Sequence, residues 1–359
     1  MLDSTELPAR VLAAGANLDP TQLGSVPASL HDRTEGVVKL GDDLFGWAPA
    51  PPPLPDPWRD PARSVARRIG EDLLLSLDAV CQALGRPVQG FDYEPDTVVL
   101  PPMRFPDPAH ATSWLRRHLV SASAAVRACG RARMRSLAVA LAARLWICAP
   151  ADVDDRWAAG LTDAGTRAAI DAREPRTFAR LLRLSAQWFA DRGDFATAEA
   201  HGVREWMAWK RLDDVDGMID VLWHRAAVYR AARRGSSELD CYPRLLSLYR
   251  RRGDEVGIAR TSAANGSALF AVGRDRDAAE QLHRTVRDIA KLPAFPTGEH
   301  AAALETLGRA HWRLGAWTAA RRRFHAALRL VDGTDGQTAD RIRGLLGVPD
   351  GQPLPEAPD

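Results

Sequence analysis

The sequence predicts an all-α protein organised as a solenoid of stacked helical hairpins. Apolar residues recur at helical spacing from Pro61 nearly to Leu346, with an interruption between Val88 and Pro108. Within this region a pattern of small and large residues repeats about every 40 residues. Glycines stand between the helical segments, where a chain reversal needs a residue that tolerates positive φ. Together these observations indicate antiparallel helices stacked in chain order.

Residues 1–48 are expected to form a small separate α/β unit. Glu6–Ala14 and Thr21–Leu30 have the spacing of short helices. Val37–Leu40 and Leu44–Trp47 are apolar strands that flank a Gly-Asp-Asp turn. Two helices followed by a hairpin suggest a degenerate winged helix. Acidic residues outnumber basic ones in this unit, which disfavours contact with DNA phosphates.

A proline-rich segment follows, and prolines this dense allow neither helix nor sheet. The first clear helix after it carries apolar residues from Leu73 to Leu84 and ends at Gly85. We therefore divide the chain into the small unit at 1–48, a linker at 49–61, helices that open the repeat region at 62–132, repeats at 133–347 and a disordered or extended tail at 348–359.

The clearest repeat runs from Leu304 to Leu330. It resembles the tetratricopeptide repeat, a helical hairpin in which small residues let two helices approach and large ones fill the groove between them. Gly315 is expected at the turn, and Ala320 is expected to pack against Gly308. The resemblance implies a right-handed superhelix whose concave face is lined by the first helix of each hairpin.

Further copies align on the turn glycines. A second copy covers Ala264–Ile289 and a third covers Leu181–Trp206, whereas weaker copies cover Leu137–Ile170 and a stretch with Gly235 near its turn. The turn glycines Gly193, Gly273 and Gly315 are 80 and 42 residues apart, so the period is about 40. Because the usual period is about 34, we expect helices longer than in the standard hairpin.

The stretch from Phe105 to Ala122 is not a repeat. Its Ala111, Trp114 and Leu115 resemble the Ala-x-x-Trp-Leu motif that opens the repeat region in actinobacterial NB-ARC-type regulators of the Streptomyces antibiotic regulatory protein family. The chain lacks a G-x-x-x-x-G-K-[ST] loop, so the ATPase site of those regulators is not expected. The resemblance, which covers roughly residues 70–345, implies a stand-alone version of their sensor region.

Composition favours a cytoplasmic protein with no demand for nucleic acid. The formal net charge is only +2, and no run of about 18 apolar residues predicts a membrane span. The N-terminus lacks the pattern of a secretory signal, and four widely spaced cysteines suggest no disulfide framework. Arginine supplies 45 of the 48 basic residues, which is typical of a high-GC, actinobacterial gene.

No constellation for catalysis, metal binding or cofactor binding is apparent. The nine histidines form no H-x-x-x-H or H-E-x-x-H pair, and there is neither a C-x-x-C motif nor a G-x-S-x-G elbow. Cys241 is expected to be a buried structural thiol. We therefore expect no enzyme, no cofactor and no metal.

The candidate binding residues come from the resemblance to peptide-binding tetratricopeptide repeats, in which fixed positions of the first helix face the groove. Asn265 is added because an amide can pair with a peptide backbone. The partner-binding set is Arg180, Arg183, Gln187, Trp223, Arg230, Arg260, Asn265, Ser267, Phe270, Arg309, Trp312 and Arg313. Six further tryptophans are expected to pack between helices: Trp146, Trp157, Trp188, Trp206, Trp209 and Trp317.

These residues indicate a non-catalytic protein- or peptide-binding scaffold that acts as an accessory or regulatory module. The abundance of arginine and aromatic side chains favours an acidic or extended segment as the ligand. Two alternatives stay open: a transcriptional regulator that contacts DNA through residues 1–48, and an enzyme that uses the solenoid as a substrate pocket. Self-association through an exposed terminal repeat is a further expectation.

Overall fold

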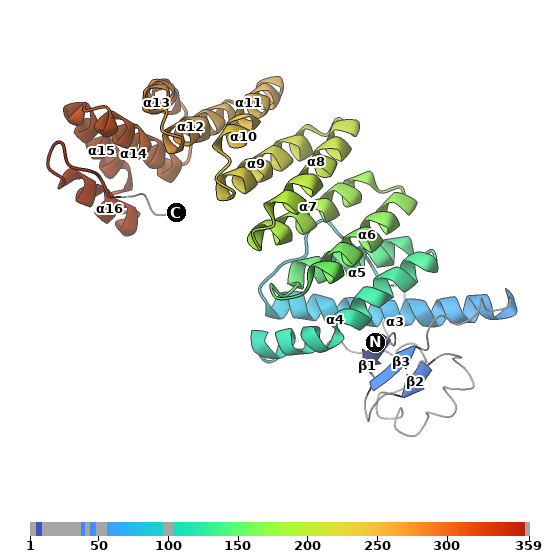
Figure 1. Ribbon diagram of the computed structural model, residues 1–359. Coiled ribbons are helices and arrows are strands. Elements are labelled where there is room, and N and C mark those ends of the chain that lie inside the picture. The colour runs from blue at the N-terminus through green and yellow to red at the C-terminus, as the bar shows by residue number, and fades with distance from the viewer. Residues whose placement is uncertain (1–4, 9–36, 40–43, 48–55, 96–102, 356–359) are drawn as a thin grey trace. The chain divides into compact units, whose positions relative to one another are not determined.

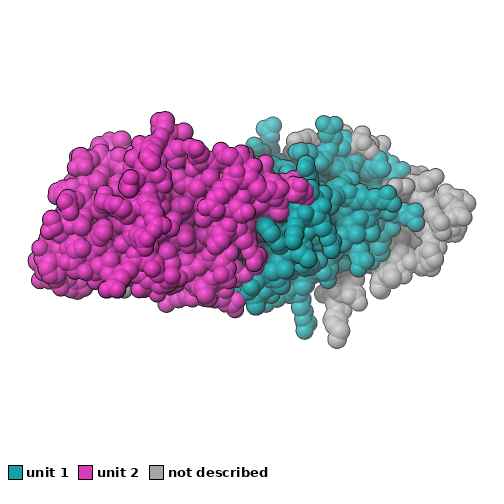
Figure 2. All heavy atoms as spheres, turned by 90° about the horizontal axis from the view of Figure 1, so that it is seen from above, with its two compact units in different colours: residues 1–212 teal, residues 213–359 magenta. Residues whose placement is uncertain are grey.

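The computed structural model describes residues 5–8, 37–39, 44–47, 56–95 and 103–355. These residues are helical apart from three short strands and the connecting segments (Figure 1). The chain divides into two compact units, residues 1–212 and 213–359 (Figure 2). Among the described helices, none has both the length and the hydropathy that crossing a membrane requires.

In unit 1 the helices pack against their neighbours in chain order, as an all-α solenoid requires. Two antiparallel pairs, α5–α6 and α7–α8, form helical hairpins (Figure 1). The helices are α3 (Asp56–Ala83), α4 (Pro108–Arg131), α5 (Arg135–Cys148), α6 (Asp155–Asp171), α7 (Pro175–Asp191) and α8 (Phe195–Arg211).

Unit 2 continues the same pattern. Its two most regular hairpins are α12–α13 and α14–α15, which are the second copy and the clearest repeat predicted from the sequence. The helices are α9 (Val215–Ala231), α10 (Gly235–Leu239), α11 (Cys241–Arg252), α12 (Glu255–Ala271), α13 (Asp275–Ile289), α14 (Thr297–Arg313), α15 (Trp317–Val331) and α16 (Gly336–Leu346).

The N-terminal strands form a small antiparallel sheet in the order β1-β3-β2, with β1 at Thr5–Pro8, β2 at Val37–Lys39 and β3 at Leu44–Trp47. The predicted hairpin is confirmed, because β2 and β3 pair with Val37 opposite Trp47. The predicted first helix is wrong at its start: Glu6 to Pro8 belong to β1, whose pairing with β3 overrides the local helical spacing. The rest of both predicted helices lies outside the described residues.

Helix α3 begins inside the predicted linker 49–61, which corrects the end of that linker. Pro57 lies in the first turn of α3, where backbone N–H groups have no partner within the helix, so a proline is tolerated there. The predicted helix end is confirmed, because Gly85 follows α3 with a φ of +66°.

The turns between helices recur with a strict spacing. A residue in the left-handed conformation stands at every twentieth position from Arg173 to Gly273, and Gly315 has the same conformation. This confirms Gly193, Gly273 and Gly315 as turn residues. In the weaker copy the turn residue is Arg233, with a φ of 55°, rather than Gly235. Gly235 instead begins α10, where a Cβ would lie 2.2 Å from Val272 Cγ1.

Inside each regular hairpin a glycine on the first helix faces a large residue on the second. A Cβ at Gly308 would lie 2.5 Å from Phe324 Cε1, and a Cβ at Gly266 would lie 2.5 Å from Leu282 Cγ. The residue nearest Gly308 is therefore Phe324, one helical turn beyond the predicted Ala320. The glycines let the helix axes approach until these fully buried side chains fill the space between them.

The aromatic residues of unit 1 pack between helices as predicted. Trp146 is buried between Trp157 and Trp188, in edge-to-face contacts with ring centroids 5.8 and 5.7 Å apart. Trp209 is also buried, and Trp206 is half-buried. Trp317 in unit 2 is the exception, because 37% of it is exposed.

We expect His118 in α4 to make unit 1 sensitive to acid. The ring is buried against Trp114, with centroids 4.8 Å apart, and its Nδ1 has no hydrogen-bond partner within the described residues. Burial and the nearby Arg117 charge lower the pKa of His118 to about 4. The unfolded chain takes up the proton at about pH 6.5, whereas the folded chain keeps the ring neutral down to about pH 4. Titration of His118 should therefore not change the free energy of unfolding above pH 6.5. It should lower that free energy by roughly 3 kcal/mol as the pH drops to 4.

Urea denaturation of the full chain and of His118→Leu at several pH values tests this expectation. The difference in unfolding free energy between the two proteins should change between pH 6.5 and 4 and stay constant above pH 6.5. A constant difference across the whole range would show that His118 is not held neutral by its surroundings.

Candidate functional site

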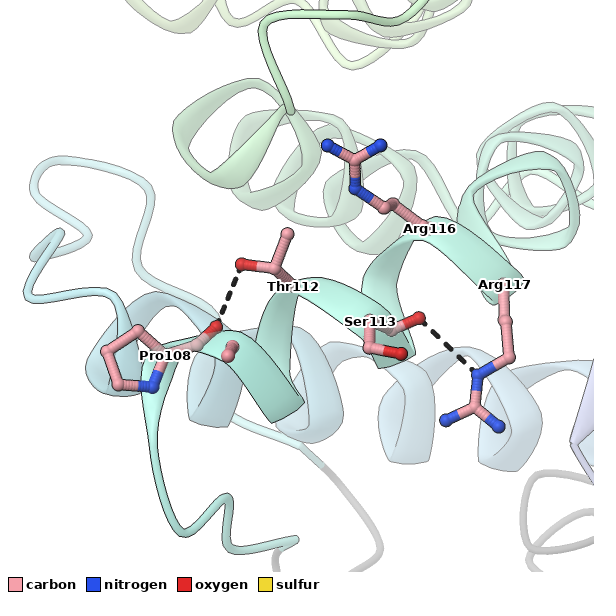
Figure 3. A pocket seen from close by; sticks show the side chains of 6 residues that line it. Pro108, Thr112, Ser113, Arg116 and Arg117 are labelled. Carbon is pink, nitrogen blue, oxygen red and sulfur yellow. Dashed lines mark hydrogen bonds between the residues drawn. The ribbon is translucent and has the colours of Figure 1, made fainter.

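The helix that carries the Trp-Leu motif has one buried and one exposed face. Ala111, Trp114 and Leu115 are buried in the core of unit 1. The exposed face forms a shallow hollow lined by α4 alone, in which Thr112 Oγ1 donates to Pro108 O and Arg117 Nε donates to Ser113 O (Figure 3). Because its three residues are buried, the motif has a packing role, and the exposed face of the helix forms only this shallow hollow.

A larger groove lies within unit 2. Its volume is about 1690 Å³, and it is lined chiefly by α9, α12 and α14, the first helices of the hairpins. The sequence predicted that first helices would line a groove, and the structure brings eight residues of the predicted set together there: Trp223, Arg230, Arg260, Ser267, Phe270, Arg309, Trp312 and Arg313.

The groove arginines are paired with acidic side chains. Arg260 forms a bidentate ion pair with Glu299 at 2.7 and 2.8 Å, and the hydrogen bonds that it donates to Glu299 raise the pKa of Arg260. Arg230 pairs with the buried Glu238 at 2.7 Å. A ligand carboxylate would have to share these guanidinium groups with the acids already bound. The groove is therefore less suited to acidic side chains than the sequence suggested.

Arg309, Glu305 and Arg341 form a connected ion cluster at the α14 end of the groove. Glu305 accepts from Arg309 Nε at 3.0 Å and from Arg341 Nη2 at 2.8 Å. Glu305 and Arg309 are both buried, and Arg309 Nη2 has no hydrogen-bond partner within the described residues. A buried guanidinium N–H without a partner is costly. Since Nη2 is itself buried, the groove donor that Arg309 provides is Nη1.

The C-terminal segment lies along this end of the groove, so of the two states predicted for residues 348–359, disordered or extended, the described part does not adopt the first. Trp312 Nε1 donates to Gln352 O at 2.8 Å, and Arg309 Nη1 donates to Pro355 O at 2.7 Å. Leu354 is half-buried and packs against the hydrophobic core of unit 2. These contacts supply the partners that a free tail would lack, so the described part, up to Pro355, is ordered.

Other groove residues were missed by sequence reasoning. Trp317 was assigned to packing, yet it lines the groove beside Gly351. Tyr249 and Arg341 also line it, although neither lies on a first helix. Only the hairpin packing brings these second-helix and terminal-helix residues to the same surface, so a rule based on first-helix positions could not find them.

The predicted residues in unit 1 are engaged within their own unit. Arg180 Nη1 donates to Gly90 O at 2.8 Å, Arg183 pairs with the buried Glu205 at 2.8 Å, and Gln187 donates to Asp191 at 2.6 Å. Asn265 of unit 2 is half-buried on α12 and is not among the residues that line the groove. None of these four residues is among those that line the unit 2 groove.

Unit 1 binds a non-helical segment of its own chain through the same kind of hydrogen bonds. Between α3 and α4, Gly90 O accepts from Arg180, and Phe91 O accepts from Arg144 Nη1 at 2.7 Å. Phe91 itself is buried. In both units, then, arginines on the helices bind main-chain carbonyls of a non-helical segment whose apolar side chain packs in or against the core.

The described residues carry no cluster of three or more potential metal ligands. Cys241 is buried as predicted, and burial raises the pKa of its thiol to about 11, so the thiolate is scarce at neutral pH.

No protein-family model matches this chain, and no curated protein matches it either. The function is therefore inferred from the chemistry of the unit 2 groove.

Proposed function

We propose that this chain is a non-catalytic, tetratricopeptide-like scaffold that binds an extended segment of a partner protein in the unit 2 groove. The observation that carries the proposal is the position of the C-terminal segment, whose carbonyls accept hydrogen bonds from Trp312 and Arg309. A surface that holds one extended segment by its main chain has the donors needed to hold another. In the cell the scaffold acts as an accessory or regulatory module in the cytoplasm.

Affinity capture from extract of the source organism tests this function. The bait is the full chain with Leu354→Asp, which removes the apolar anchor of the tail, and the comparison bait carries Trp312→Phe in addition. We expect a protein that is enriched on the first bait and depleted on the second, because Trp312→Phe keeps the ring and removes the N–H donor. Equal recovery on both baits would show that the groove is not the binding surface.

The salt dependence of capture separates two kinds of ligand. Recognition through main-chain carbonyls should change little between low and moderately high salt, since the groove arginines are already ion-paired. An acidic ligand would be lost as the salt concentration rises.

A further inference from the structure

The residues of the C-terminal segment dictate how it lies in the groove. Pro353 and Pro355 fix their own φ and restrict Gln352 and Leu354 to extended conformations. An extended polyproline-type segment has three residues per turn, so carbonyls three residues apart point in the same direction. The two carbonyls that the groove binds, at Gln352 and Pro355, have this spacing.

The contacts define what the groove recognises. Trp312 and Arg309 on α14 donate to the carbonyl that precedes the Pro-Leu-Pro unit and to the carbonyl of its last proline. The leucine between the prolines packs on the core. The side chain of Gln352 is exposed, so the groove contacts this residue through its main chain and places no demand on its side chain. The contacts of the tail involve Arg309 and Trp312 on α14 and Trp317 on α15, whereas Trp223 on α9 and Arg260 on α12 line the same groove.

The same tetrapeptide pattern occurs a second time in this chain. Pro353-Leu354-Pro355-Glu356 in the tail matches Pro53-Leu54-Pro55-Asp56 in the proline-rich segment. Both copies are Pro-Leu-Pro followed by an acidic residue. This recurrence provides a second natural peptide with which to test recognition of the motif apart from the tail.

We infer that the unit 2 groove is a receptor for extended Pro-Leu-Pro segments presented by a partner protein, and that the C-terminal tail occupies the groove until such a segment displaces it. This inference rests on the proposed function and names its ligand class. A tethered tail competes at an effective concentration of about millimolar. The partner's segment must therefore bind tightly or reach beyond the tail into the rest of the groove.

Fluorescence anisotropy with two synthetic peptides tests the inference. The probes are residues 350–359 and residues 50–58, each labelled, with a Leu→Ser version of each as the control peptide. The hosts are the full chain, a chain that ends at Pro349, and the full-length Leu354→Asp variant, which serves if the shortened chain folds poorly. We expect both probes to bind the two tail-released hosts, and to bind the full chain at least tenfold more weakly. The Leu→Ser peptides should lose at least tenfold in affinity.

A matched pair of tryptophan variants checks the contacts. Trp312→Phe in a tail-released host should weaken both probes several-fold, because it removes the donor to the first carbonyl. Trp209→Phe removes an indole N–H in α8 of unit 1 and should leave both affinities unchanged.

Failure to bind either probe in both tail-released hosts would overturn the ligand class. If Trp312-dependent capture of a protein still occurred, the proposed function would stand, and only the Pro-Leu-Pro ligand class would be wrong. If the tail-released chain instead formed concentration-dependent oligomers that Leu54→Ser abolished, the occupant would be a second copy of this chain, and the partner-protein proposal would be overturned.

Discussion

Glu305→Gln is expected to destabilise unit 2 by about 3–5 kcal/mol, the usual cost of removing one member of a buried ion pair. Glu305 is buried and accepts from Arg309 on its own helix and from Arg341 on α16. The neutral amide leaves the buried Arg309 guanidinium without its charge partner, and it removes the link between α14 and α16. Guanidinium denaturation of the full chain measures the loss, and hydrogen exchange of α14 and α16 amides locates it in unit 2.

Glu280→Gln is the matched control. Glu280 pairs with Arg284 within α13, and both side chains are 65% exposed, so solvent screening leaves little to lose. We expect no measurable change in stability. Equal losses for the two variants would mean that the buried cluster does not hold α14 and α16 together. Capture and peptide binding should also weaken in Glu305→Gln, because Glu305 orients the guanidinium that binds Pro355 O.

Phe324→Ala is expected to lower the free energy of unfolding by about 3–5 kcal/mol. It leaves a cavity where a fully buried ring fills the space between α14 and α15. Gly308→Ala should cost about 1–3 kcal/mol for the opposite reason, since its Cβ would overlap the ring of Phe324. Combining Gly308→Ala with Phe324→Leu should recover part of that loss. Denaturation of Gly308→Ala, Phe324→Leu and the double variant measures this coupling.

Gly298→Ala provides the control on the same helix. A Cβ there meets no atom within 4 Å, so the substitution should be neutral or stabilise by up to about 1 kcal/mol through helix propensity. If Gly298→Ala and Gly308→Ala destabilised equally, close packing at Gly308 would not be the cause.

Local features of the sequence predicted much of the fold. Helical spacing of apolar residues gave the hairpins of both units, and the positive φ of Gly193, Gly273 and Gly315 confirms the predicted turns. Arg233 shows the limit of this approach, because an arginine carries no turn signal and adopts positive φ only where the packed helices on either side require it. The start of α3 was missed for a related reason, since proline is compatible with a first helical turn as well as with a linker.

The sequence by itself determined the helical class, the repeat of small and large residues, and eight of the residues that line the groove, because each depends on periodicity within one helix or one hairpin. Tertiary structure alone decided which charged side chains form ion pairs. Arg260 and Glu299 are far apart in the chain and pair only after α12 and α14 have packed. It also decided the place of the tail. Prolines in a terminal segment predict a disordered or extended chain when the sequence identifies no partner for it. In the structure, Trp312 and Arg309 supply the hydrogen-bond donors that hold the proline-rich main chain in place.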